Sequence, residues 1–127
     1  MTEGYDQRLT KRVAADLPME WWRTEKQTFR KARQVTMSAR IVNVSASGIA
    51  FRGAPNPDAP VNRVVPFTCS GLDGDMRIRR IEETEDPDEL VYAAELIEPS
   101  RELMEALLGA TEMAPRQRYE LIWNTSD

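Results

Sequence analysis

Near the start of the 127-residue chain, every second residue is apolar over a stretch of nine residues. The apolar set is Val13, Ala15, Leu17, Met19 and Trp21. Successive side chains of a β-strand point to opposite faces, so this period of two predicts a strand with one buried and one solvated face. Pro18 lies on the solvated face and has no N–H for a neighbouring strand, which predicts a sheet edge or a bulge there.

Five further segments have the composition of strands, and turn-forming residues separate them. They are residues 35–42, 48–52, 63–69, 76–82 and 90–97, the last of which is apolar almost throughout and is expected to be central. Residues 54–61 contain three prolines and are expected to form a loop. Asp73-Gly74 is a dipeptide typical of tight hairpin turns, and residues 83–89 are expected to form an acidic turn around Pro87.

A short helix is expected after the last strand. Ser100 can cap it by accepting a hydrogen bond from a backbone N–H, and Glu102 lies in the first turn, where the helix dipole favours negative charge. Gly109 is placed to end the helix. Four apolar residues share one helix face: Leu103, Met104, Leu107 and Leu108. Six short strands in hairpin order and one helix predict a mainly β fold, a six-stranded antiparallel β-barrel with a C-terminal α-helix.

The length of the chain fits one domain. We divide it into a flexible leader (1–11), a barrel with its helix (12–109) and a C-terminal extension (110–127) of uncertain structure. The extension contains four large apolar residues in its second half, so it is expected to pack on the domain or on a second copy. No apolar run approaches the roughly 20 residues needed to cross a bilayer, so no membrane segment is expected.

The sequence contains no histidine and one cysteine. Without histidine there is no imidazole base, no histidine metal site and no Ser-His-Asp triad. Cys69 continues the alternation of Val65 and Phe67, so it is expected to pack in the core, and a lone cysteine suits a reducing cytoplasm. We therefore expect a cytoplasmic protein that is not an enzyme and has neither catalytic nor metal-binding residues.

Charge is distributed unevenly along the chain. Residues 1–53 carry ten basic and five acidic side chains, a local charge of +5, whereas residues 54–127 carry seven and sixteen, a local charge of −9. An anionic partner would be drawn to the first half. The basic residues of 23–34 are interpreted as a solvated hairpin connection in preference to a nucleic-acid-binding loop.

A polar corner, Asn43-Val44-Ser45-Ala46-Ser47-Gly48, separates the second and third predicted strands. Asn and Ser side chains can hydrogen-bond neighbouring backbone, and glycine can adopt φ values that other residues avoid. Asn43 and Ser45 are two positions apart, so in an extended backbone their polar atoms point the same way. This predicts a small face of donors and acceptors at the rim of the sheet, suited to holding a ligand.

Two motifs occur in order on these elements. Residues Arg8 to Arg12 fit R-x-x-x-R directly before the first strand, and Asn43 to Gly48 fit [D/N]-x-S-x-x-G at the end of the second. Together they resemble the PilZ domain, a receptor module for the bacterial second messenger cyclic di-GMP. The resemblance extends from Arg8 to Gly109.

The resemblance implies a cyclic di-GMP site. Arg8 and Arg12, in a leader that closes over the ligand, would grip phosphates and guanine edges, and arginine can make bidentate bonds to both groups. Asn43 and Ser45 would hydrogen-bond a guanine, and Gly48 would keep the corner open for the base. No other cofactor is implied.

Two residues depart from the commonest family pattern. Asn43 replaces an aspartate, which removes a charged acceptor. Gln7 stands where many members carry a further arginine, and this favours one ligand per chain over an intercalated ligand dimer.

Three functions follow from these observations. The leading hypothesis is a cyclic di-GMP receptor that reorders its leader on binding and signals to a downstream protein effector. The second is a PilZ-like protein-interaction module that has lost nucleotide binding, which the two intact motifs disfavour. The third and least favoured is a single-stranded nucleic-acid binder that uses residues 23–40 with Trp21, Trp22 and Phe29 as stacking faces; Trp21 is expected to be in the core.

Overall fold

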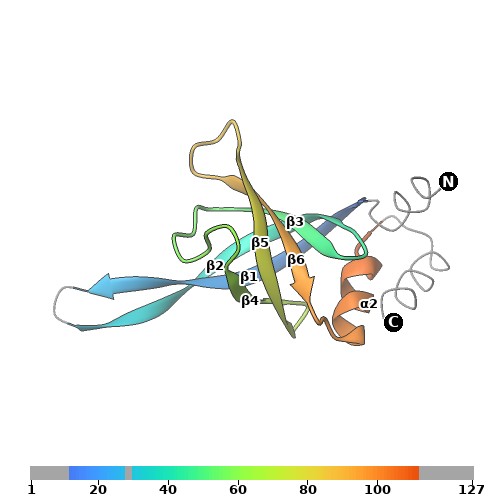
Figure 1. Ribbon diagram of the computed structural model, residues 1–127, viewed down its shortest axis with the longest axis horizontal. Coiled ribbons are helices and arrows are strands. Elements are labelled where there is room, and N and C mark those ends of the chain that lie inside the picture. The colour runs from blue at the N-terminus through green and yellow to red at the C-terminus, as the bar shows by residue number, and fades with distance from the viewer. Residues whose placement is uncertain (1–11, 28–29, 112–127) are drawn as a thin grey trace.

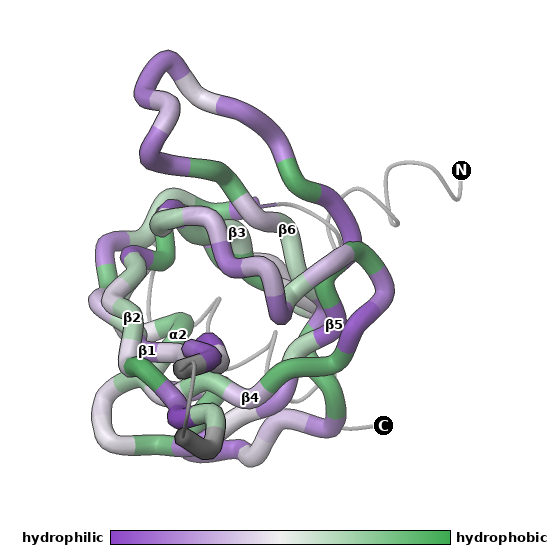
Figure 2. Tube along the Cα trace, turned by 90° about the vertical axis from the view of Figure 1, so that its left-hand side faces the viewer, coloured by the Kyte–Doolittle hydropathy of each residue, from purple (hydrophilic) through white to green (hydrophobic). Residues whose placement is uncertain are grey.

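The computed structural model describes residues 12–27 and 30–111 (Figure 1). Six strands and one helix follow in sequence: β1 (Val13–Gln27), β2 (Arg30–Val44), β3 (Gly48–Gly53), β4 (Val64–Cys69), β5 (Leu72–Glu83), β6 (Leu90–Ile97) and α2 (Arg101–Gly109). The strands close into an antiparallel barrel in the order β1-β2-β3-β6-β5-β4, which appears as a ring when viewed end-on (Figure 2). The predicted fold class, a six-stranded antiparallel barrel followed by a helix, is confirmed.

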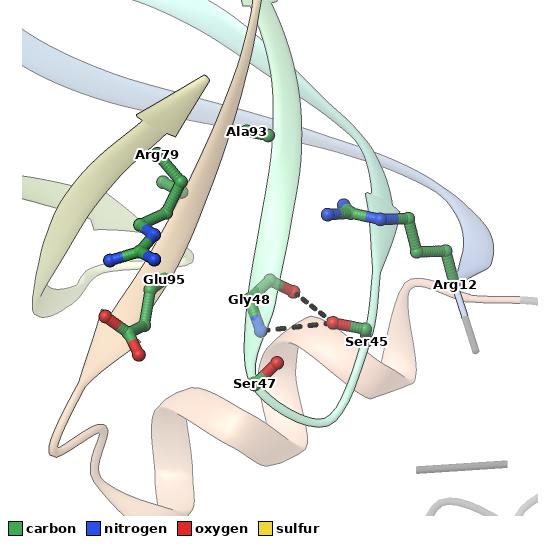
Figure 3. Close-up of a pocket in the computed structure, with 8 residues that line it drawn as sticks. Arg12, Ser45, Ser47, Gly48, Arg79, Ala93 and Glu95 are labelled. Atoms are coloured by element: carbon green, nitrogen blue, oxygen red, sulfur yellow. Dashed lines mark hydrogen bonds between the residues drawn. The ribbon is translucent and has the colours of Figure 1, made fainter. Parts of the chain in front are cut away.

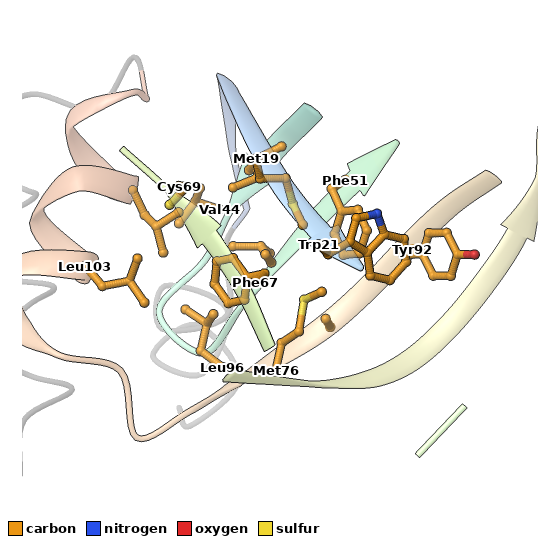
Figure 4. Packing of buried hydrophobic residues seen from close by; sticks show 14 of the residues in the cluster. Met19, Trp21, Val44, Phe51, Phe67, Cys69, Met76, Tyr92, Leu96 and Leu103 are labelled. Carbon is orange, nitrogen blue, oxygen red and sulfur yellow. The ribbon is translucent and has the colours of Figure 1, made fainter. Parts of the chain in front are cut away.

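Three aromatic side chains from three strands pack together in the barrel core, on the side away from α2 (Figure 4). The ring of Trp21 on β1 stands edge-on to Phe51 on β3 and to Tyr92 on β6, with centroid distances of 5.0 and 4.9 Å. Phe51 and Tyr92 stack at 5.1 Å. Each of the three residues is at most 1% exposed. Such contacts stabilise a core beyond simple area burial, and here they join strands that are far apart in sequence.

The helix covers one end of the barrel. Its four apolar side chains, Leu103, Met104, Leu107 and Leu108, are buried as predicted. The hydroxyl of Ser100 accepts a hydrogen bond from the N–H of Leu103 at 3.1 Å, which confirms the predicted cap. Cys69 is also buried among core residues, and its burial raises the pKa of the thiol above its ordinary value.

The turn between β4 and β5 differs from the prediction. Ser70 and Gly71 form it, with φ values of 52° and 74°, and two successive positive φ values are characteristic of a tight hairpin turn. Gly74 lies inside β5, opposite Phe67. The assignment of the turn to Asp73-Gly74 was wrong, because this glycine serves a packing contact: a Cβ atom on Gly74 would lie 2.7 Å from Leu103 Cδ2.

Residues 23–34 belong to a hairpin, as expected, but the two strands are longer than predicted and take up most of this segment. β1 and β2 continue through this segment as a two-stranded ribbon, with Arg23 paired to Val35 and Glu25 to Arg33. The ribbon extends beyond the barrel (Figure 1). Because neither of its faces is covered there, the sequence lacks the apolar alternation that reveals a half-buried strand.

Pro18 itself pairs in register with Arg40, and the irregularity of the first strand lies before it. The register of β1 against β2 shifts between Ala14 and Leu17. Within the described chain, β4 pairs with β1 only at Glu20, opposite Thr68.

No helix in the described ranges is long and apolar enough to cross a bilayer. The predicted leader, residues 1–11, and the extension beyond Thr111 lie outside the described residues.

Replacing Gly74 by alanine should destabilise the domain. The added Cβ would lie 2.7 Å from Leu103 and 2.8 Å from Phe67, whose side chains are fully buried and would have to shift. Overpacking of this kind costs about 1–3 kcal/mol, which lowers the melting temperature by several degrees. Gly109→Ala is the matched control, because nothing lies within 4 Å of its added Cβ. Equal melting temperatures for the two variants would contradict the packing role of Gly74.

Candidate functional site

The polar corner between β2 and β3 is held by Ser45. Its backbone N–H donates to the carbonyl oxygen of Gly48 at 2.9 Å. Its hydroxyl accepts from the N–H of Gly48 at 3.2 Å and also lies 3.3 Å from the Gly48 carbonyl oxygen, to which it donates (Figure 3). Ser45 is only 3% exposed. Its hydroxyl therefore stabilises the turn and retains one acceptor lone pair for another group.

Gly48 is required for a different reason from the one expected. Its φ does not lie in the left-handed region, since Gly71 is the only glycine with positive φ in the described ranges. A Cβ on Gly48 would instead lie 2.3 Å from the backbone oxygen of Ala94 on β6. The corner needs glycine because β3 and β6 approach closely there, and the backbone oxygen cannot swing aside as a side chain could.

The start of β1 lies beside the end of β2, and this pairing joins the two sequence motifs. Val13 pairs with Val44 and Ala14 with Asn43. Nη1 of Arg12 donates to Oδ1 of Asn43 at 2.9 Å across this junction. Residues 31 positions apart in sequence are thus in direct contact.

Asn43 and Ser45 do not form the single extended face that was expected. β2 ends at Val44, and Ser45 turns back onto Gly48. The register of β2 against β3 also shifts between Ile41 and Asn43, so simple alternation does not hold along this segment. Asn43 orients Arg12, whereas Ser45 shapes the corner.

A hollow of about 180 Å³ lies over the corner. Its lining comes from four regions of the chain: Arg12, Ser45, Ser47, Gly48, Arg79, Ala93, Ala94 and Glu95. In Figure 3, Arg12 and Arg79 lie on opposite sides of Gly48. Three of the predicted site residues, Arg12, Ser45 and Gly48, therefore share one surface depression. Arg8 lies outside the described residues.

Sequence reasoning missed Arg79. It lies on β5 between Ile78, which pairs with Ala94, and Arg80, which pairs with Ala93, so it is the extra residue of a bulge. Bulges redirect side chains. The signal was present in Arg77-Ile78-Arg79-Arg80, where two adjacent charges break the alternation of the strand. Partner strands are not evident from sequence, so nothing there indicated that Arg79 faces the corner.

Two arginines and one glutamate, Glu95, line the hollow, so the net charge of its lining is positive. Arg77 lies 3.8 Å from Glu95 and Arg80 lies 2.7 Å from Glu82, so the other two arginines of β5 each have a carboxylate partner. Within the described ranges, Arg79 has none. Arg12 is exposed and bonded to a neutral amide. Guanidinium groups beside a depression can bind a phosphate or a carboxylate through paired N–H donors.

No group of three or more potential metal-ligating side chains occurs among the described residues. Neither protein-family models nor curated proteins gave a match to this chain.

Two neighbouring serines provide a test of the corner. Ser45→Ala removes the acceptor for the N–H of Gly48 and leaves a buried donor unpaired, which costs about 1–3 kcal/mol. Ser47 is exposed, and its backbone oxygen accepts from Leu96 N–H at 2.9 Å, a bond that alanine retains. Ser47→Ala should therefore change stability by less than about 0.5 kcal/mol. Urea unfolding of both variants would measure the difference, and similar free energies of unfolding would contradict the structural role of the Ser45 hydroxyl.

Proposed function

We propose that this protein is a cyclic di-GMP receptor that binds its ligand at the hollow over the polar corner and signals to a protein partner without catalysis. The observation that carries the proposal is the contact of Arg12, the last residue of the R-x-x-x-R motif, with Asn43, the first of [D/N]-x-S-x-x-G, beside a hollow that Arg12, Ser45 and Gly48 line. Neither motif is specific alone, but their convergence supports a shared site.

The type of each residue suits this ligand. A guanidinium has five N–H donors, so Arg12 can keep its bond to Asn43 while donating to a phosphate or to guanine O6 and N7. Arg79 adds a second cation on the other side of Gly48. Backbone and hydroxyl groups at Ser45 and Ser47 offer neutral hydrogen-bonding partners for a base.

The hollow is smaller than the ligand requires. Sites for drug-sized molecules usually measure about 300–1,000 Å³, compared with about 180 Å³ here. The hollow would hold part of a cyclic dinucleotide, and another segment must cover the rest. The leader with Arg8 directly precedes Arg12 and is the segment we assign to this role, so that ligand binding reorders it.

The position of Arg12 also suggests how binding reaches a partner. Three residues after Arg12, Ala15 forms a β-bridge with Thr111, which follows α2. A change at the start of β1 would therefore bear on the end of the helix and on the chain that continues from it. We propose that a protein effector responds to this region.

The alternative function, binding of single-stranded nucleic acid, is weakened because one of its three proposed stacking residues is buried. Trp21 is 1% exposed and packs against Phe51 and Tyr92, so it offers no face to a base. Trp22 is partly buried against the core cluster, and Phe29 lies outside the described residues. An interaction module without nucleotide binding is the remaining alternative, and calorimetry with cyclic di-GMP separates it from the receptor.

Replacing Arg12 should weaken binding without affecting the fold. Arg12→Ala removes charge-assisted hydrogen bonds of about 1.5–3 kcal/mol, so isothermal titration should show a loss of roughly 10- to 100-fold in affinity. Its bond to Asn43 is exposed, so the melting temperature should barely change. Arg8→Ala should behave likewise, and Arg63→Ala, an exposed arginine outside the hollow, should bind normally. Gly48→Val should lose stability and affinity together, because its side chain would collide with Ala94. Normal binding of cyclic di-GMP by Arg12→Ala would contradict the proposed role of Arg12 in holding the ligand.

Binding should also distinguish guanine from adenine. If the arginines and the polar corner contact guanine edges, cyclic di-AMP loses several hydrogen bonds, each worth about 1–3 kcal/mol. Titration of the wild-type protein with both dinucleotides should therefore show at least a tenfold preference for cyclic di-GMP. Similar affinities would mean that the site reads only the phosphates, and no measurable binding of either would favour the interaction module.

A further inference from the structure

The β1–β2 ribbon leaves the barrel where its neighbouring strands end. On one side, β3 pairs with β2 as far out as Ala39, opposite Gly53. On the other side, β4 pairs with β1 at Glu20. From Trp22 and Thr36 outward, the described part of the ribbon has no third strand, and Figure 1 shows it projecting from the barrel. Each of its edges therefore has backbone groups that a neighbouring strand would otherwise use.

The loop between β3 and β4 covers the β1 edge. Nδ2 of Asn56 donates to the carbonyl oxygen of Trp22 at 3.0 Å, and the N–H of Thr24 donates to a carboxylate oxygen of Asp58. Asn56 is 6% exposed, and its own N–H donates to the hydroxyl of Tyr92 at 2.9 Å. Side chains anchored to the core thus replace the missing strand on this edge.

The same two bonds show which backbone groups are open on the β2 edge. In an antiparallel pair, residues alternate between those that bond each other and those whose N–H and C=O both point away. The backbone N–H and C=O groups of Trp22 and Thr24 point away from β2. The same groups of their partners, Thr36 and Gln34, therefore point away from β1. Both are exposed, and within the described chain no hydrogen bond reaches their outward backbone groups. This edge is open.

Charge distinguishes between possible partners for the open edge. Residues 22–38 contain five basic side chains and one acidic, a local charge of +4 in a chain of net charge −4. The single acid, Glu25, lies between two of the cations, 4.0 Å from Arg23 and 3.7 Å from Arg33. Arg33 nevertheless remains 64% exposed. Two identical ribbons would repel each other, whereas an acidic strand would be attracted.

We propose that the β2 edge at residues 32–38 is a docking site for an extended acidic segment of a partner protein, which adds to the ribbon as a further strand. Seven residues of strand span about 23 Å, long enough for a short peptide to bond at alternate positions. An open backbone edge favours a polypeptide over nucleic acid, which has no backbone amides to pair with it. The site uses no residue of the hollow and does not depend on nucleotide binding.

The test uses a fluorescein-labelled peptide of nine residues in which glutamate alternates with valine, and a control peptide with lysine in place of glutamate. Gln34→Pro removes the outward N–H of Gln34, whereas Gln34→Ala retains it. Fluorescence anisotropy should show binding of the glutamate peptide to the wild type and to Gln34→Ala, and a loss of about tenfold or more for Gln34→Pro. Arg33→Gln should weaken binding several-fold, and the lysine peptide should not bind.

Hydrogen exchange of the wild-type protein provides a measurement independent of the variants. The amides of Gln34 and Thr36 should exchange quickly in the free protein and become protected when the glutamate peptide is added, whereas the amide of Val35, which faces β1, should be protected in both states. This alternation would distinguish strand addition from attachment by charge alone.

Several outcomes would overturn the proposal. Equal affinity of Gln34→Pro and Gln34→Ala, or no change in the exchange of Gln34 and Thr36, would exclude strand addition. Displacement of the peptide by a 16-base-pair DNA duplex that itself binds both variants equally would identify the ribbon as a nucleic-acid site. Dimerisation of the wild type at high concentration that Gln34→Pro abolishes would assign the edge to a second copy of the chain.

Discussion

The outer edge of β1 is the constraint around which the domain is arranged. Closing the barrel requires β1 to pair with β4, yet within the described chain the two strands pair only at Glu20, opposite Thr68. Unpaired backbone groups at a buried or half-buried edge are costly. Other parts of the chain supply hydrogen-bond partners for the backbone groups of this edge. Thr111 pairs with Ala15 near one end of the strand, and Asn56 and Asp58 bond to it beyond the barrel.

These replacements connect the edge to the core and to the site. The N–H of Asn56 donates to the hydroxyl of Tyr92, so the β3–β4 loop is fixed to the same aromatic cluster that contains Trp21. Burial raises the pKa of Tyr92, and the bond from Asn56 opposes this rise. The phenol therefore stays protonated at neutral pH. At the other end of β1, the strand begins beside Asn43, which is why Arg12 reaches the polar corner.

Much of the fold could be predicted because the relevant signal was local. The alternation of apolar and polar residues predicted the strands that have one face in the core. Ser100 as a cap and the four apolar residues of one face predicted the helix. The errors occurred where a residue's role depends on a distant neighbour. Gly74 and Gly48 are glycines because Leu103 and Ala94 approach them, and neither contact is visible from local sequence. Arg79 faces the hollow because of a bulge on β5, and the ribbon has no buried face to produce a pattern.

The two proposed binding regions lie at opposite ends of the β1–β2 ladder, and their separation suggests that they act independently. Arg12 and Thr24 are twelve residues apart, about 40 Å along an extended strand. Between Leu17 and Glu25 the ladder with β2 has no register shift. Coupling between sites requires an element with two alternative states. The irregularity between Ala14 and Leu17 is the one place on the described part of β1 near the hollow that could absorb a shift, and it adjoins the bridge to Thr111. A movement of Arg12 would therefore be passed to the end of α2 and would leave the ribbon in place.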